Sequence, residues 1–153
     1  MVKDLETSEC MSLLSDNCIG HLGYIAGKSP FIVPVTYFYD LENKSIISYS
    51  APGHKIQSMR MYGQVSLQVD EITTMLQWRS VLINGSFEEL KGSTAKKCLR
   101  TFTNGVKEII LRTKGQKTES IREFSSKMEK EASPIVYRIH ISDIVGKYRN
   151  QKI

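Results

Sequence analysis

The 153-residue sequence has no long hydrophobic run. No segment approaches the roughly 20 consecutive apolar residues that a transmembrane helix needs, so we expect no membrane partner. Cysteine is also scarce, and Cys10, Cys18 and Cys98 are odd in number and lack the spacing of a zinc site. The first residues are polar and include acids, unlike a signal or transit peptide. We therefore expect reduced thiols in a cytoplasmic protein.

The signature motifs of several enzyme classes are absent too. The sequence contains no P-loop, no G-x-G-x-x-G and no G-x-S-x-G. His21, His54 and His140 lie in three separate segments without the spacing of metal ligands, so we expect no metal site. No Ser-His-Asp triad is recognisable in the sequence, although triads are defined by geometry and not by order. The catalytic residues are therefore left unassigned.

Positive charge is concentrated in one segment. Residues 1–90 hold six Lys/Arg and ten Asp/Glu (net −4), residues 91–117 hold eight and one (net +7), and residues 118–153 hold seven and five (net +2). A basic segment of this kind is either a nucleic-acid patch or the solvated face of a helix. Aromatic residues are sparse there, and Phe102, Val106 and Ile110 recur at helical spacing. We favour the helix and expect no nucleic-acid partner.

Short alternating segments bounded by turn residues predict a mainly β domain with flanking helices. The size of the chain suits one domain over residues 1–153. Strands are predicted over 19–25, 31–39, 45–50, 64–69, 78–90 and 135–145. Helices are predicted near residues 5–15, from residue 54, and over 93–113 and 118–131. Six strands at short spacing indicate an antiparallel sheet that closes into a barrel, with a helical insertion at about 93–131 packed outside it.

The segment from Ser48 to Arg60 predicts an anion site. A strand ends in the turn Ala51-Pro52-Gly53, and a short helix then begins at about His54. The free amides and the positive dipole end of that helix favour a phosphate, to which Lys55 adds a charge and Ser50 a hydroxyl. A solvated turn is the alternative reading.

Pro34 interrupts the most apolar strand. Proline lacks an N–H and belongs on an edge strand or at a bulge, so backbone groups near Val35 and Thr36 are expected to be open to a planar ligand. The alternative is an edge strand without a ligand.

Arg79 opens the fifth predicted strand on the same side as the apolar residues Val81 and Ile83. A guanidinium in such a row needs an anionic partner, because an unpaired buried charge is costly. A phosphate or a carboxylate would serve, and the alternative is an arginine that reaches solvent.

Together these segments resemble one family. Gly20-His21-Leu22-Gly23-Tyr24-Ile25, the segment from Pro30 to Tyr39, the segment from Ile47 to Ile56 and Trp78-Arg79-Ser80-Val81-Leu82-Ile83-Asn84-Gly85 follow its order and spacing. The chain is similar to the flavin-nucleotide-binding split-barrel group, which is related to pyridoxamine 5′-phosphate oxidase and the nitroimidazole-resistance proteins. The resemblance covers residues 5–91 and extends to 134–146.

The resemblance implies a six-stranded antiparallel split β-barrel that forms a homodimer, with one FMN per subunit at the subunit interface. It implies that the flavin phosphate lies against the turn from Ser50 to Lys55 and Arg79, and that the flavin ring edge lies along Pro34, Val35 and Thr36. The further cofactor-binding residues that it implies are Tyr49, His54, Trp78, Ser80 and Val81.

The function that the resemblance implies is an FMN-dependent oxidoreductase of unknown small-molecule substrate, with a reduced nicotinamide as a possible electron donor. The extra basic residues and the C-terminal segment of the oxidases themselves are not identified in this chain, so oxidation of vitamin B6 is not carried over. The alternatives are a flavin carrier or sensor without turnover and a haem-binding relative on the same barrel. His54 and Tyr49 are candidate acids or bases only because they lie near the predicted site.

Overall fold

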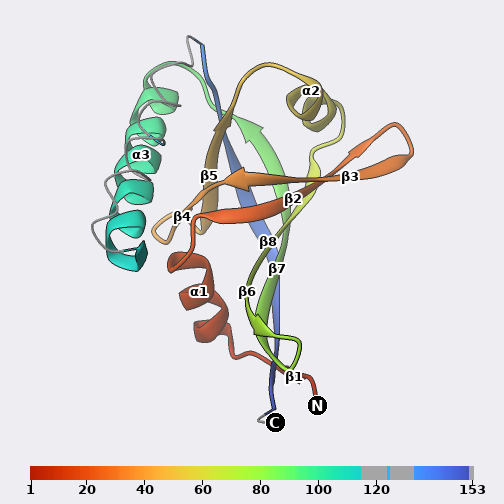
Figure 1. Cartoon of the computed structure of the whole chain (residues 1–153). Helices are drawn as coiled ribbons and strands as arrows, with labels where there is room; N and C mark the ends of the chain where they lie inside the picture. Colours follow the sequence, from red (N-terminus) through yellow and green to blue (C-terminus); the bar gives the residue numbers. More distant parts are fainter. Residues whose placement is uncertain (115–123, 125–132, 152–153) are drawn as a thin grey trace.

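The computed structural model describes residues 1–114, 124 and 133–151. The described chain folds into one curled sheet with helices against it (Figure 1). In chain order the elements are β1 (Lys3–Asp4), α1 (Thr7–Ser15), β2 (Ile19–Ala26), β3 (Ser29–Thr36), β4 (Phe38–Asp40), β5 (Ser45–Ser50), α2 (His54–Met61), β6 (Gln64–Thr74), β7 (Gln77–Glu89), α3 (Gly92–Lys114) and β8 (Ile135–Asn150).

The sheet is antiparallel, with the strand order β3-β2-β6-β7-β8-β5-β4 and with β1 paired to β8. The strands at the two ends of this order, β3 and β4, follow each other in the chain and are separated only by Tyr37. The Ser48 hydroxyl of β5 donates a hydrogen bond of 2.7 Å to the Thr36 carbonyl of β3, so the far ends of the sheet meet. The predicted antiparallel split barrel is therefore confirmed.

The number of strands differs from the prediction, because the described residues form a sheet of eight strands instead of six. Strand β1 has two residues, too few to produce an alternating pattern. The segment predicted as one strand over 31–39 is divided at Tyr37, whose N–H still bonds to the Cys18 carbonyl at 2.8 Å in the register of β2 and β3. From Phe38 onward the chain pairs with β5 instead, so β3 and β4 are separate strands. The helix predicted over 118–131 lies outside the described residues, apart from Phe124.

The barrel interior is filled by the inward-facing residues of alternating strands. This alternation was predicted for β6 and β7, and the structure confirms it with Val65, Leu67, Val69, Val81 and Ile83 all buried. Helix α1 closes one end of the barrel with two side chains that have no exposed surface, Leu13 and Leu14. Each fully buried aliphatic side chain of this kind contributes about 1.5–3 kcal/mol.

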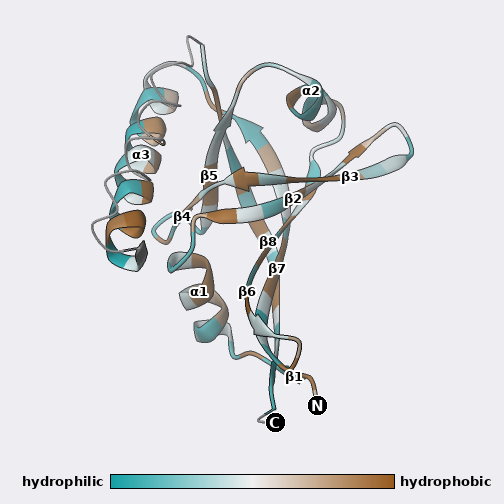
Figure 2. Cartoon of the chain, viewed as in Figure 1, coloured by the Kyte–Doolittle hydropathy of each residue, from teal (hydrophilic) through white to brown (hydrophobic). Residues whose placement is uncertain are grey.

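Helix α3 packs on the outside of the barrel and forms a second core. Phe102 and Val106 have no exposed surface and cluster with Ile47 of β5 and Val136 of β8. Figure 2 shows that α3 carries both hydrophobic and hydrophilic stretches, as an amphipathic helix does. The helix predicted over 93–113 is confirmed, and its basic residues Lys96, Lys97 and Arg100 are exposed.

A buried ion pair ties β4 to β8 beside this second core. The Arg138 guanidinium donates to the Asp40 carboxylate at 2.8 Å, and both side chains are 12% exposed. Burial acts to raise the pKa of Asp40, but hydrogen bonds from Arg138 and Asn43 outweigh it and hold the pKa below its usual value. Arg138 also donates to the Cys98 sulfur of α3 at 3.0 Å, which connects the helix to the sheet.

Candidate functional site

The site begins at the joint between β5 and α2, where the sequence predicted an anion site. Helix α2 starts at His54, and Gly53 stands at its N-cap, where it has no side chain to bond the first amides. Ile56 and Met59 anchor the helix on the barrel with almost no exposed surface. The first turn of α2 therefore keeps backbone donors and the positive end of its dipole at the mouth of the site.

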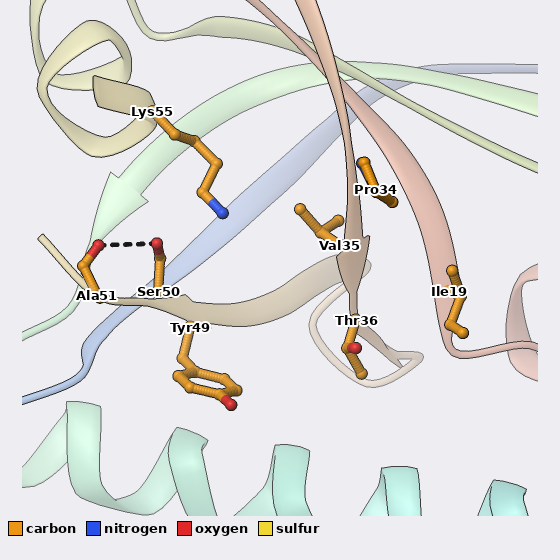
Figure 3. A pocket seen from close by; sticks show the side chains of 8 residues that line it. All are labelled: Ile19, Pro34, Val35, Thr36, Tyr49, Ser50, Ala51 and Lys55. Carbon is orange, nitrogen blue, oxygen red and sulfur yellow. Dashed lines mark hydrogen bonds between the residues drawn. The ribbon is translucent and has the colours of Figure 1, made fainter. Parts of the chain in front are cut away.

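A pocket of about 400 Å³ opens in front of this joint, between β3, β5 and α2 (Figure 3). We call it the β3–α2 pocket. Its lining residues are Ile19, Pro34, Val35, Thr36, Tyr49, Ser50, Ala51 and Lys55. The structure therefore brings together most of the residues that the sequence predicted for the phosphate turn and for the ring edge.

Lys55 and Ser50 lie on the α2 side of the β3–α2 pocket. Figure 3 shows the Lys55 side chain reaching from α2 toward Val35 and Ser50, which places an ammonium group inside the pocket. The Ser50 hydroxyl donates to the Ala51 carbonyl at 2.8 Å, which leaves its oxygen lone pairs as acceptors. To donate to a phosphate, this hydroxyl would have to rotate away from Ala51.

The opposite wall is the edge of the sheet. Strand β3 is the last strand in the order and, within the part of the chain that the structure describes, pairs only with β2, where Pro34 lies opposite His21. The prediction that Pro34 belongs to an edge strand is therefore confirmed. One side of the backbone from Pro34 to Thr36 faces the pocket instead of another strand, and the Thr36 carbonyl already accepts the Ser48 hydroxyl.

Tyr49 lines the pocket, but its ring points away from Lys55. Figure 3 shows the ring directed toward α3, where it packs edge-on against Phe102 with ring centroids 5.4 Å apart. Tyr49 therefore supports the floor of the pocket and joins it to the second core.

His54 was predicted beside Lys55, but it faces the other side of α2. Its Nδ1 lies 3.0 Å from the Tyr24 hydroxyl, and its ring meets Phe31 edge-on at 5.0 Å. Successive helical residues point about 100° apart, which separates the two neighbours. His54 lines a different pocket, described below.

Trp78 and Arg79 also lie apart from Lys55 within one chain. They line a pocket of about 470 Å³ near the β6–β7 turn, with α1 and the end of β8. Arg79 has the anionic partner that its position predicted, because its Nη2 lies 2.9 Å from the Glu71 carboxylate. Both side chains are more than a third exposed, so this ion pair contributes little stability and can be exchanged.

The last two predicted residues lie on opposite faces of β7. Val81 has no exposed surface and points into the barrel core, so its side chain offers nothing to a ligand in this chain. Ser80 points outward and accepts a hydrogen bond from the Gln68 side chain at 3.0 Å.

The outward-facing residues of the sheet form a continuous surface that reaches the β3–α2 pocket. The strand register aligns Pro34, His21, Gln68, Leu82 and Val145 across it. We call this the outer face, and its exposed apolar residues are Ile19, Ile32, Ile72, Leu82 and Val145. Polar groups on it already bond to one another, as Gln68 does to His21 at 3.2 Å and to Asp70 at 2.9 Å.

Sequence reasoning missed one lining residue, Ile19, whereas Ala51 belongs to the turn that it predicted. Ile19 is the outward-facing first residue of β2 and lies opposite Thr36, and it is 56% exposed despite its apolar side chain. An isoleucine on the outward phase of an alternating strand was the available signal.

The described residues form neither a metal centre nor a membrane-spanning helix. No group of three or more His, Cys, Asp or Glu side chains is arranged to hold a metal ion in that part of the chain. Within the same residues, no helix has the length and hydropathy to span a bilayer.

Comparison with known proteins agrees with this geometry. A solved FAD-binding protein from Mesorhizobium loti is 28% identical, with a TM-score of 0.76, and the match covers 99% of this chain and 98% of that one. An FAD-binding protein from Mycobacterium smegmatis shares the fold at 16% identity and a TM-score of 0.62, over 96% and 98% of the two chains.

Among curated sequences, an uncharacterized protein of Rhizobium meliloti (strain 1021) is 33% identical over 89 residues. That match spans 58% of this chain and 58% of the relative. The family model described as pyridoxamine 5′-phosphate oxidase matches residues 6–148, which is nearly the whole chain. The resemblance inferred from the sequence is thereby confirmed, and the chain belongs to the pyridoxamine 5′-phosphate oxidase family.

Proposed function

We propose that the β3–α2 pocket binds the flavin and phosphate of a flavin nucleotide, with FMN as the smallest ligand that carries both. The family and the FAD-binding relatives support a flavin, and FAD contains the same flavin mononucleotide unit. The observation that carries the proposal is the placement of Lys55 and the uncapped first turn of α2 across one pocket from the open edge of β3.

The phosphate end of the pocket suits a dianion. Lys55 supplies a full positive charge, and the α2 amides behind Gly53 supply donors that no side chain caps. Charge-assisted hydrogen bonds of this kind are shorter and stronger than neutral ones. A neutral ligand would leave the ammonium without this gain.

The edge of β3 suits the polar rim of a flavin ring. The backbone from Pro34 to Thr36 can present amide and carbonyl groups in the plane of such a ring, because no described strand pairs with β3 on that side. Ile19 and Val35 add apolar surface for the ring itself.

We further propose that the protein is a homodimer with the flavin at the subunit interface. The outer face carries exposed apolar side chains and satisfied polar groups, which is the composition of a surface that a second copy covers. Ile19 and Thr36 belong both to this face and to the pocket wall, so a second copy on the outer face would also border the ligand.

The dimer resolves the separation of Lys55 and Arg79. In one chain they line different pockets, so contact of both with one phosphate requires the partner's Arg79. The weak ion pair between Arg79 and Glu71 would then be exchanged for the phosphate.

The activity that we propose is a flavin-dependent oxidoreductase acting on a small molecule, with a reduced nicotinamide as electron donor. The flavin supplies the electron transfer when bound. The residues of this chain hold its phosphate, orient its ring against β3 and exclude water through Ile19, Val35 and the partner subunit.

The absorption spectrum of the purified protein tests the cofactor. The visible absorption bands of an oxidised flavin are expected. A Soret band would favour a haem-binding relative. Flavin bands that persist unchanged under NADH and NADPH would favour a carrier or sensor without turnover.

Substitution of Lys55 tests the phosphate site. Lys55→Ala should weaken FMN binding by about 1–3 kcal/mol and leave riboflavin binding unchanged, because riboflavin has no phosphate. The matched control is Lys97→Ala, an exposed lysine on α3 that should change neither. Equal affinities of the wild-type protein for FMN and riboflavin would contradict this site.

Light scattering tests the dimer. The expected mass is about twice the 17.4 kDa of one chain. Leu82→Arg on the outer face should give a monomer with weakened flavin binding, whereas Leu41→Arg in the exposed β4–β5 turn should not. A wild-type monomer that still binds flavin would disprove the interface proposal.

A further inference from the structure

A second pocket lies on the other side of α2, facing the β2–β3 hairpin. We call it the hairpin pocket, and its volume is about 740 Å³, within the range of ordinary ligand sites. Its lining residues are Ile25, Ala26, Gly27, His54, Gln57, Ser58, Met61 and Tyr62. The proposed oxidoreductase function gives this pocket no role.

An ordered aromatic wall stands beside the hairpin pocket. Tyr24 and Phe31 stack with ring centroids 5.6 Å apart and planes 13° from parallel. His54 meets Phe31 edge-on at 5.0 Å and is held by the Tyr24 hydroxyl at 3.0 Å. Of these three rings, His54 lines the pocket, so it is the ring that the cluster presents to a ligand, and Phe31 and Tyr24 hold it in place.

The polar groups of the pocket suit an uncharged heterocycle. None of its lining residues is Asp, Glu, Lys or Arg. The Ser58 hydroxyl gives its hydrogen to the His54 carbonyl at 2.7 Å, so it can only accept from a ligand, for example from an exocyclic amine. The Gln57 amide can both donate and accept, as the edge of a purine requires.

The hairpin pocket continues the flavin site and does not stand alone. His54 and Lys55 are neighbours at the start of α2, and each lines one of the two pockets. Along β3, Val35 borders the first pocket and Phe31 contacts His54 beside the second. Val35 and Phe31 are four strand residues apart, about 13 Å, so the two pockets lie near enough for one extended ligand to enter both.

We propose that the hairpin pocket binds the adenine of FAD, so that FAD and not FMN is the preferred flavin. The inference rests on the proposed function, because Lys55 and the α2 amides would hold the pyrophosphate between the two pockets. His54, with Phe31 packed against it, offers aromatic surface against which the adenine stacks, and Gln57 and Ser58 meet its polar edge.

The test is calorimetric titration of the flavin-free full-length protein with FAD and with FMN. FAD should bind at least about tenfold more tightly, on the scale of one base stacked on an aromatic ring. Adenosine, which has no phosphate, should compete with FAD and leave FMN binding unchanged. Equal affinities for FAD and FMN would overturn the adenine site and leave the flavin site standing.

A variant and its control locate the effect. His54→Leu replaces the ring that lines the pocket with an apolar side chain, and it should abolish the advantage of FAD without changing the affinity for FMN. Leu41→Ile is the control, because Leu41 is 58% exposed in the β4–β5 turn and lines neither pocket. If His54→Leu fails to fold, Phe31→Leu serves the same purpose, because it removes the ring that packs against His54. A FAD preference that survives the ring variant would overturn the inference, and failure of both flavins to bind would overturn the proposed function with it.

Discussion

Replacing Phe102 with alanine is expected to destabilise the protein by about 3–5 kcal/mol, the usual range for truncating a buried phenylalanine. Phe102 has no exposed surface and lies at the centre of the core between α3 and the barrel. Its ring packs against Tyr49 at 5.4 Å and Phe124 at 5.9 Å, so truncation opens a cavity with two aromatic walls. The upper half of the range applies because rigid strands on one side limit collapse of the cavity.

Urea unfolding followed by circular dichroism measures this cost directly, as a lower midpoint at an unchanged slope. Leu111→Ala is the matched control on the same helix, because Leu111 is 49% exposed. This substitution should change the free energy of unfolding by no more than about 0.5 kcal/mol. Phe102→Ala should also weaken flavin binding, since Tyr49 lines the β3–α2 pocket and rests on this ring. A loss below about 1 kcal/mol, or one equal to that of the control, would refute α3 as part of the folded core.

Three further outcomes are expected. Because the pKa of Asp40 is lowered in the folded protein, its ion pair with Arg138 stabilises above the unfolded pKa of about 3.9, and this contribution is lost as the pH falls through the folded value. Asp40→Asn should therefore flatten the acid limb of a stability–pH curve, and an unchanged limb would contradict this. Burial raises the pKa of Tyr137 to about 12, although the Ser48 side chain acts to lower it. Because the unfolded pKa is about 10, the stability should decline as the pH rises above about 10. Tyr137→Phe should reduce that decline. Replacing both Lys96 and Lys97 with Gln should leave flavin affinity unaltered in a fluorescence titration, and sequence-selective DNA binding lost in that variant would instead favour a nucleic-acid role.

The sequence predicted most of the fold because the outward and inward phases of the strands are regular. One buried face of a strand was predicted from the alternation of Val65, Leu67 and Val69, and one buried face of a helix from the spacing over 93–113. The structure confirms both. The division at Tyr37 was not predictable, because it depends on a change of partner from β2 before Tyr37 to β5 after it. Both halves remain extended and apolar, so the local sequence does not show which strand lies beside each half.

The candidate site was predictable where its residues are close in the chain. Ser50 and Lys55 share one turn, and Pro34 to Thr36 share one strand edge, so local chemistry located both walls. The direction of His54 around α2 is set by the hydroxyl of Tyr24 and the ring of Phe31, which are 30 and 23 positions away. The spacing of residues within α2 carries no information on such distant partners. For the same reason, the sequence did not show that Arg79 and Lys55 line different pockets.

The open edge of β3 also bears on how the protein avoids aggregation through edge-to-edge pairing of strands. A strand with an unpaired backbone edge is a template on which another chain can add a strand, and Ile32 and Phe31 would make that added pairing apolar. Pro34 interrupts such a template, because it has no N–H to complete a continuous ladder. The residue that keeps this edge open to a ligand thus also makes it a poor seed for aggregation, and replacing it would risk fibres as well as a lost site.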